Sequence, residues 1–296
     1  MSDTPWSLFD ATVAEVVDRT PNLRRVTFEG EGLRDLADPG TDTRIKLLVA
    51  ADADGAAEAY RAMGSDAASM AALRTLGDGI TMRTYTLAAW EQTPTGARVS
   101  VDFARHDPAV AGPATRWAEQ ARRGQAMRIV GPVRSFDGEV GGREFRAAGL
   151  GREELLLVAD HCALPAVERI LAELPPHARG LAVIECPTPE DRLDLDRPDG
   201  VEVRWIHGAG GCPGPVLAEL DAWGTQDDST PQPDAVRGDD GDELFWEVDG
   251  EEARRVWVAA EASVARDVRR LVVGEKGLNK RAVAFMGYWR TGRAES

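Results

Sequence analysis

The pattern of secondary structure predicted by the sequence changes halfway along the chain, and this change limits the possible folds more than any other feature. The first half carries short segments rich in β-formers and separated by Gly, Pro and Asp, which is typical of a barrel or sandwich. The second half alternates strands with helices, which indicates βαβ units around a parallel sheet. Because 296 residues exceed what most single cores sustain, we expect two domains, at 1–149 and 150–296.

Six segments of the first half are predicted as strands: residues 10–17, 23–29, 44–50, 82–87, 98–103 and 126–130. One helix is predicted over Gly112–Arg122, because Pro113 suits a first helical position and Gly124 follows the end. Residues 56–76, rich in Ala and Met, could be helical and are interpreted as an insertion between strands.

Strands and helices alternate in the second half. The predicted strands are residues 154–158, 181–185, 201–206, 256–259 and 282–285, and the predicted helices are residues 164–174, 215–223 and 262–273. The segment from 224 to 243 is rich in Pro, Gly and Asp, and we predict a disordered acidic loop there.

Charge and composition exclude several classes of protein. The net charge of -15 argues against a nucleic-acid partner, since phosphate binding needs a basic face. No apolar run approaches the roughly 18 residues of a membrane helix, and no secretory signal is recognised at the N-terminus. Three widely spaced cysteines indicate reduced thiols, so the protein is expected in the cytoplasm.

The first cluster with chemical potential is Arg83-Thr84-Tyr85-Thr86, on a predicted strand. Alternate side chains of a strand share a face, so Arg83 and Tyr85 point one way and the threonines the other. A tyrosine ring can stack on a planar cofactor, and an arginine can bind a phosphate with two hydrogen bonds. An ordinary barrel strand with a surface arginine explains the same residues when they are taken alone.

A second cluster surrounds the start of the helix predicted at Gly112. The free N–H groups of a helix start suit a pyrophosphate, Gly112 permits close approach, and Thr115 adds a hydroxyl. Asp102-Phe103 and His106 precede this helix and could face the same ligand. Taken alone, a plain helix cap and a structural histidine are the simpler interpretations.

Two further clusters follow strands of the second half. Residues 160–166 (DHCALPA) come directly after a strand and open a helix, which is where an open α/β sheet binds ligands. Residues 287–292 (GYWRTG) follow the last predicted strand and could cover a planar cofactor. The cysteine spacing does not match a zinc site, so no metal is expected, and a packed small residue is the simpler interpretation of Cys162.

Together these clusters resemble one family in their order and spacing, the siderophore-interacting proteins. The resemblance rests on residues 83–86, 101–103, 106, 112–117, 131–132, 163–166, 257–259, 261 and 287–290. It implies an FAD-dependent ferric-siderophore reductase with a ferredoxin-reductase-like fold. The expected architecture is an N-terminal antiparallel Greek-key barrel that binds FAD, followed by a parallel-sheet domain of the NAD(P)H-binding kind.

The resemblance also implies roles for individual residues. Tyr85 resembles the residue that stacks on the isoalloxazine, Thr86 the one that bonds its reactive edge, and Arg83 a phosphate ligand. The implied cofactor-binding residues are Arg83, Thr84, Tyr85, Thr86, Asp102, Phe103, His106, Gly112, Ala114, Thr115 and Trp289. The implied nicotinamide-side residues are Asp160, Cys162, Ala163 and Glu261.

The sequence departs from the family pattern at several places. Ala88 stands where an arginine is usual, and Ala159-Asp160-His161-Cys162 replaces Gly-Asp-Glu-Thr. Ala260 replaces the glycine of Ala-Gly-Glu. Two of the three changes fall where NAD(P)H would approach, so NAD(P)H and ferredoxin both stay open as electron donors. Three cysteines are too few for the iron–sulfur centre of a sister group.

The chemistry implied by the resemblance needs no general acid or nucleophile. Reducing Fe(III) to Fe(II) weakens its binding to the hard oxygen ligands of a siderophore. Basic side chains would attract the anionic ferric complex, and the candidates are Lys46, Arg134 and Arg290. Two alternatives remain at this stage: an NAD(P)H:flavin-type reductase on the same fold, and a flavin- or siderophore-binding protein without turnover.

Overall fold

The computed structural model divides the chain into two compact units, Met1–Arg143 and Glu144–Ser296. The residues described are 4–52, 54–64, 73, 79–106, 111–138, 140–146, 150, 154–221, 223, 245–248 and 255–292. The division falls at 143/144, against the 149/150 proposed from the sequence. The predicted acidic loop at 224–243, and residues 65–72 and 74–76 of the predicted insertion, lie outside the described residues.

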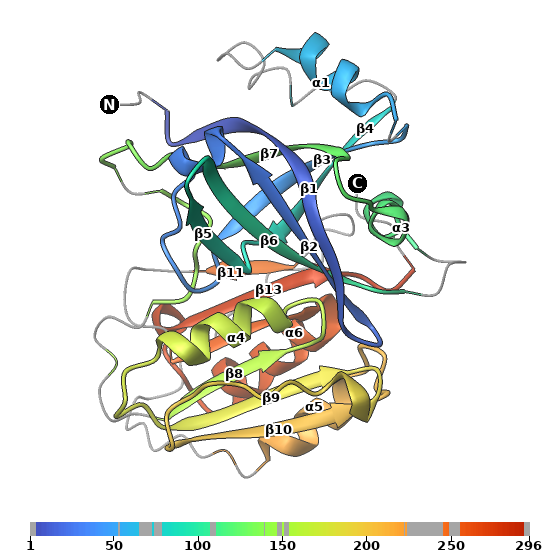
Figure 1. Cartoon of the computed structure of the whole chain (residues 1–296). Helices are drawn as coiled ribbons and strands as arrows, with labels where there is room; N and C mark the ends of the chain where they lie inside the picture. The colour runs from blue at the N-terminus through green and yellow to red at the C-terminus, as the bar shows by residue number, and fades with distance from the viewer. Residues whose placement is uncertain are drawn as a thin grey trace. The chain divides into compact units, whose positions relative to one another are not determined.

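The first unit is a seven-stranded antiparallel sheet with the order β4-β3-β7-β1-β2-β6-β5 (Figure 1). The strands are β1 (Trp6–Thr20), β2 (Leu23–Gly30), β3 (Arg44–Ala50), β4 (Ile80–Thr86), β5 (Ala89–Thr93), β6 (Gly96–Ala104) and β7 (Ala126–Pro132), and a 3-10 turn spans Gly32–Asp35. Strand β4 is at one edge of this order, yet the Tyr85 ring on β4 lies 4.6 Å from the Phe103 ring on β6. The sheet therefore curls around its core, and the predicted antiparallel β architecture is confirmed.

Alternation along the strands decides which side chains enter this core. On β6, Val99, Val101 and Phe103 are buried in the core cluster, which also takes Ile45 and Leu47 from β3. Helix α1 (Ala56–Met63) contributes Ala56 and Tyr60 to a second apolar cluster, which it shares with residues of β1, β3 and β7. Helix α3 (Pro113–Gln120) contributes Trp117 to the main core. The predicted helix at Gly112 is thus present, whereas β5 was not predicted.

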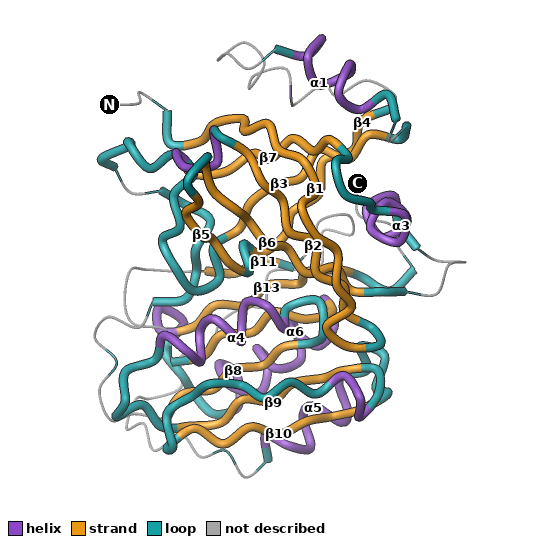
Figure 2. Tube along the Cα trace, in the orientation of Figure 1, coloured by secondary structure: helices purple, strands orange, loops and turns teal. Residues whose placement is uncertain are grey.

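The second unit is a six-stranded sheet with the order β10-β9-β8-β12-β13-β11 (Figure 2). Its strands are β8 (Leu155–Ala159), β9 (Gly180–Cys186), β10 (Val201–His207), β11 (Trp246–Val248), β12 (Val256–Glu261) and β13 (Val283–Trp289). All neighbours pair in parallel except β11, which pairs antiparallel with β13. The predicted parallel sheet is confirmed, and β11 was not predicted.

Helices cover both faces of this sheet, which explains why every residue of β8 is buried. Helices α5 (Pro213–Leu220) and α6 (Ala262–Arg269) pack on the face that carries Leu156 and Val158. Helix α4 (Leu164–Glu173) lies on the opposite face (Figure 1). A 3-10 turn spans Pro189–Asp191, a π-helical turn continues α6 over Arg270–Glu275, and another 3-10 turn precedes β13 at Lys280–Ala282.

One prediction about the C-terminal cluster is wrong. Strand β13 runs to Trp289, so Gly287, Tyr288 and Trp289 lie within the last strand and do not follow it. The extension forms because Ala260 of β12 pairs with Gly287, and after an irregularity Glu261 pairs with Trp289. Within the described part of the chain, no helix is long and apolar enough to cross a membrane.

Candidate functional site

In the first unit, a row of aromatic rings connects β4 to α3. The centroid of Tyr85 lies 4.6 Å from that of Phe103, and Phe103 lies 5.8 Å from Trp117 on α3. Phe103 and Trp117 are buried, whereas Tyr85 is only partly buried. Tyr85 is therefore the ring of this row that the core does not fully enclose, and it lies beside the helix that was predicted to hold the pyrophosphate.

The start of α3 is built to accept an anion. Gly112 is its N-cap, no side chain caps it, and Pro113 takes the first helical position. Open space surrounds the place where a side chain of Gly112 would begin. Among the described residues, which omit 107–110, no side chain accepts a hydrogen bond from the first amides of α3, and together with the positive end of the helix dipole these amides fit a phosphate group. Ala114 and Thr115 lie on this first turn and are buried.

The remaining residues of the β4 cluster occupy both faces of the strand. The Arg83 guanidinium donates a hydrogen bond to the carbonyl of Met82, at 2.9 Å. Thr84 is exposed and accepts a hydrogen bond of 3.0 Å from Lys46 Nζ on β3, while Thr86 is buried. Lys46 thus lies on the face opposite Tyr85, because Thr84 and Tyr85 are successive residues of one strand.

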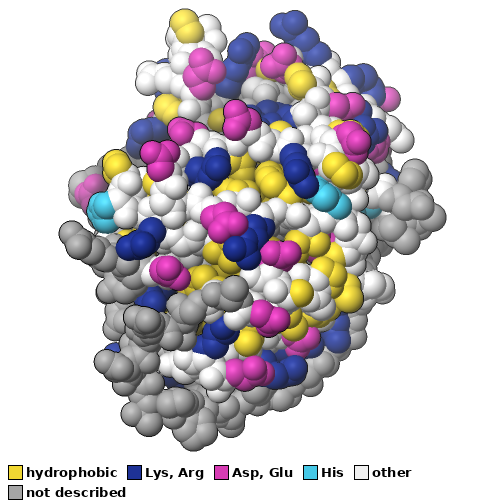
Figure 3. All heavy atoms as spheres, turned by 90° about the horizontal axis from the view of Figure 1, so that it is seen from below, with side chains coloured by type: hydrophobic (Ala, Val, Ile, Leu, Met, Phe, Trp, Pro, Cys, Tyr) yellow, Lys and Arg dark blue, Asp and Glu magenta, His cyan; other side chains and the backbone are white. Residues whose placement is uncertain are grey.

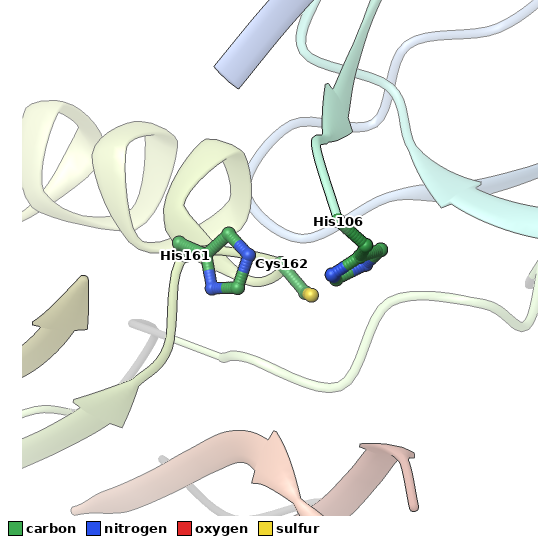
Figure 4. A group of neighbouring side chains, drawn as sticks. All are labelled: His106, His161 and Cys162. Carbon is green, nitrogen blue, oxygen red and sulfur yellow. The ribbon is translucent and has the colours of Figure 1, made fainter. Parts of the chain in front are cut away.

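Asp102 belongs to a buried ion-pair network. Its side chain is fully buried, and its two oxygens accept hydrogen bonds of 2.6 and 2.8 Å from Arg25 on β2. Arg19 on β1 adds a third bond of 2.8 Å. The carboxylate points away from the core that holds Phe103, so the two adjacent residues serve different sides of β6. His106, which follows β6 (Figure 4), is an exposed residue.

In the second unit, Asp160 organises the loop between β8 and α4. It is 1% exposed, and its Oδ1 accepts hydrogen bonds from the amides of Cys162, at 2.9 Å, and Ala163, at 3.3 Å. Its Oδ2 accepts a 2.5 Å bond from Trp289 Nε1 on β13. Burial raises the pKa of Asp160 to about 6, although these hydrogen bonds act in the opposite direction. The amides before α4 are therefore occupied by the protein's own carboxylate.

Glu261 plays a similar part at the end of β12. Its Oε2 accepts a 2.5 Å hydrogen bond from the amide of Ser263 and caps α6, and its Oε1 accepts a 3.1 Å bond from the amide of Thr291. Asp160 and Glu261 thus lie at the carboxyl ends of the neighbouring parallel strands β8 and β12, and both engage the segment around Trp289. The predicted nicotinamide-side residues are brought together at one edge of this sheet.

The turn that leads into α4 also carries His161 and Cys162 (Figure 4). Burial lowers the pKa of His161 to about 4, so the imidazole is neutral at physiological pH. Cys162 is half-buried, and its thiol offers only a weak hydrogen-bond donor where the family pattern has threonine. Ala163 is fully buried at the start of α4.

The three predicted substrate-binding cations have different surroundings. Arg134 donates hydrogen bonds of 3.1 Å to the carbonyls of Arg34 and Leu36, and its guanidinium lies 4.4 Å from the centre of the Trp90 ring. Lys46 is on the exposed side of β3, and Arg290 directly follows β13 in the other unit. Arg134 thus stabilises the fold through these contacts, and its role in binding the substrate stays a prediction.

Sequence reasoning missed Glu185, at the carboxyl end of β9. It is 6% exposed, and its Oε1 accepts a 3.0 Å hydrogen bond from the amide of Gly211. Burial raises the pKa of Glu185, and the nearby charges of Asp160 and Glu261 shift it in the same direction. An acid at the end of the apolar run Leu181–Ile184 was the signal that could have identified it. Arg19 and Arg25 were also missed.

Comparisons with known proteins match both units of the chain. Residues 12–136 match the siderophore-interacting FAD-binding domain, and residues 152–292 match the siderophore-interacting protein model. Protein Rv2895c of Mycobacterium tuberculosis is 30% identical and covers 100% of this chain, which spans 94% of that protein. The ferric vibriobactin reductase ViuB of Vibrio cholerae is 23% identical over 93% of this chain and 86% of its own length.

Solved structures share the fold. A siderophore utilization protein from T. fusca superposes with a TM-score of 0.68 and 24% identity, over 98% of this chain and 95% of that one. The matched domains account for both units, and the aromatic row, the uncapped start of α3 and the carboxyl edge around Asp160 all lie within them. The chain therefore belongs to the siderophore-interacting protein family, whose FAD-binding domain forms its N-terminal part.

Proposed function

We propose that this protein binds FAD in its first unit and uses it to reduce the iron of a ferric siderophore, which releases the metal as Fe(II). The observation that supports this most strongly is the uncapped start of α3 beside the row formed by Tyr85, Phe103 and Trp117. An anion-binding helix start next to a partly exposed ring fits a flavin that carries a pyrophosphate. The name of the relative ViuB, a ferric vibriobactin reductase, supports the substrate class.

The protein's own residues have limited tasks in this reaction. Tyr85 would stack on the isoalloxazine, the amides at Gly112–Thr115 would hold the pyrophosphate, and Arg83 would pair with a phosphate. Bound FAD supplies the redox chemistry, because a flavin accepts a hydride and can pass on electrons singly. Reduction alone releases the metal, since Fe(II) binds hard oxygen ligands more weakly than Fe(III) does.

We propose NAD(P)H as the electron donor, with reduced ferredoxin as the alternative. The carboxyl edge at Asp160 and Glu261 is the position where parallel α/β sheets bind ligands. Cys162 and Ala260, which depart from the family pattern, lie at this edge, and Ala260 adds a methyl group where glycine is usual. We therefore expect slow hydride transfer from NAD(P)H, and faster transfer after Cys162→Thr is combined with Ala260→Gly.

We also propose that Lys46, Arg134 and Arg290 attract the anionic ferric complex. Lys and Arg side chains are interspersed with Asp and Glu on the face drawn in Figure 3, so the net charge of -15 does not make this face uniformly acidic. Eleven acids lie between residues 227 and 252, which concentrates much of the excess in one segment. At about 0.1 M salt, electrostatic attraction extends over roughly 10 Å. These three cations can therefore attract an anionic ferric complex nearby even though the net charge of the chain is negative.

The test is anaerobic reduction of the purified holoprotein, followed through the visible absorbance of the oxidised flavin, which is lost on reduction. NADH, NADPH and reduced ferredoxin are supplied separately, and a ferric siderophore is then added with a chelator that colours only with Fe(II). Donor-dependent bleaching is expected, followed by reoxidation with about two Fe(II) formed per flavin, because a hydride gives the flavin two electrons and each Fe(III) takes one. Bleaching without iron reduction would indicate a flavin-type reductase, and no bleaching with any donor would indicate a binding protein without turnover. A protein that takes up no FAD would refute the whole proposal.

A further inference from the structure

Three buried carboxyl groups gather at the carboxyl ends of three adjacent strands in the second unit. They are Asp160 after β8, Glu185 on β9 and Glu261 at the end of β12, with 1%, 6% and 3% of their surface exposed. In the sheet order, β9 and β10 lie on one side of β8 while β12 and β13 lie on the other. The cluster therefore surrounds the point where the strand order reverses, which is where open α/β sheets bind ligands.

No arginine or lysine among the described residues forms an ion pair with this cluster. The hydrogen bonds to the three carboxyl groups come from backbone amides, from the hydroxyl of Ser263 and from the indole of Trp289. Asp102 in the first unit is buried to a similar degree, yet two arginines neutralise it. Buried charge without a counter-ion is costly, so the cluster in the second unit is set up to favour an added positive charge.

Glu185 is the member of the cluster with an unused polar atom. Its Oε2 is buried and has no hydrogen-bond partner, whereas its Oε1 holds the amide of Gly211 at 3.0 Å. A side chain on Gly211 would begin 2.9 Å from Glu261 and 3.2 Å from the Trp289 ring. Gly211 thus lies next to Glu185, Glu261 and Trp289, and the charge of Glu185 interacts with both Asp160 and Glu261.

A planar cation suits this cluster better than a metal ion. In the described part of the chain, these three side chains do not bring their oxygens within 4.8 Å of one another as a ligand set for an ion would. A positive charge spread over a ring does not need carboxylate oxygens that meet at one point, because the field of several carboxylates stabilises it at once. The indole of Trp289 adds an aromatic face, which attracts cations.

We propose that Asp160, Glu185 and Glu261 make this edge selective for the oxidised, cationic form of a nicotinamide ring over its neutral reduced form, with Glu185 as the residue that sets the preference. The proposal rests on the proposed use of NAD(P)H. The hydride leaves the dihydronicotinamide with both electrons of its C–H bond and passes to the flavin, and the ring keeps one positive charge. Carboxylates that stabilise this charge favour hydride donation and bind the product tightly.

The experiment compares two dinucleotides that do not reduce the flavin, so the holoprotein stays oxidised throughout. One is NADP⁺ or NAD⁺, whichever binds more tightly, and the other is its 1,4,5,6-tetrahydronicotinamide analogue, which has the same phosphates and an uncharged ring. Dissociation constants are measured by calorimetry for the wild type, for Glu185→Gln and for Glu202→Gln. Glu202 lies on the edge strand β10, is exposed and pairs with Arg204, so its variant removes the same charge away from the cluster.

We expect the wild type to bind the oxidised form more tightly, and Glu185→Gln to reduce that preference about three- to tenfold, as expected for one unscreened charge a few ångströms from the ring. Glu202→Gln should leave the preference unchanged. Equal affinities in the wild type, an unchanged preference in Glu185→Gln, or no binding of either dinucleotide would each overturn the proposal. Reduction of ferric siderophore is measured separately, so a failed preference in a working reductase overturns this inference alone.

If Glu185→Gln does not retain FAD, the wild type supplies a second measurement. Its preference for the oxidised ring should increase from pH 5 to pH 8, because the pKa of Asp160 is about 6, that of Glu185 is raised, and both ionise as the pH rises. The charged or titratable groups that act on Glu185 are Asp160, Glu261 and the Cys186 thiol, and burial holds the pKa of that thiol at about 12, above this range. A preference that stays constant over this range would contradict the inference.

Discussion

Asp102→Asn separates a structural role of this carboxylate from the cofactor-binding role suggested by the family resemblance. The change removes the negative charge that three hydrogen bonds from Arg25 and Arg19 neutralise. Hydrogen bonds to charged groups contribute about 1.5–3 kcal/mol each, so the gross loss for these three bonds is about 4.5–9 kcal/mol. Arg25 and Arg19 remain 26% and 17% exposed and recover part of this through water, and the asparagine can still accept one bond. We expect a net destabilisation of the first unit of about 2–4 kcal/mol.

The assay is hydrogen–deuterium exchange of β2 and β6 peptides in increasing urea, on protein freed of FAD. This readout reports the first unit separately, since Arg25 pairs with Asp102 across these two strands. Glu29→Gln is the matched control, because Glu29 and Arg98 form an exposed 3.5 Å pair on the same two strands. An exposed pair of this kind contributes about 0–1 kcal/mol.

The result that would refute this reasoning is a variant as stable as Glu29→Gln. If Asp102→Asn instead lowered FAD affinity and left the stability of the FAD-free protein unchanged, the carboxylate would contact the cofactor directly.

Three further predictions follow from the same geometry. Tyr85→Ala should weaken FAD binding by about 1–3 kcal/mol if the ring stacks on the flavin, while Tyr85→Phe should retain most of it; equal binding by both variants in a flavin-release titration would contradict the stacking. Trp289→Phe removes the hydrogen bond that lowers the pKa of Asp160, so carboxyl NMR should show this pKa rising above about 6, and an unchanged value would exclude the contact. In the folded state the pKa of Glu185 is raised, so ionisation of Glu185 lowers stability as the pH rises. Glu185→Gln keeps the acceptor for the amide of Gly211. Its free energy of unfolding should therefore exceed that of the wild type at pH 8 but not at pH 4. A difference that stays the same at both pH values would show that the pKa of Glu185 is equal in the folded and unfolded states.

The sequence predicted the parts of the protein that depend on local order. The apolar run of β8 indicated a strand buried on both faces, and Gly112-Pro113 indicated the start of α3, because proline fixes its own φ at a value that suits a first helical position. The order of the weak motifs along the chain was enough to indicate the family, and the matched domains confirm it.

The tertiary structure decided which side chains meet. Asp102 was assigned to the cofactor from the family resemblance and because it precedes the helix at Gly112. Only strand pairing shows that it faces Arg25 while Phe103 faces the core. Glu185 is distant in sequence from Asp160 and Glu261, and the three come together only because β9, β8 and β12 are neighbours in the sheet. Periodicity along one segment reports which face of that segment is buried. It carries no information about which distant strand lies alongside, and in this protein that pairing determines that Asp102 is neutralised by two arginines while Asp160, Glu185 and Glu261 have no basic partner among the described residues.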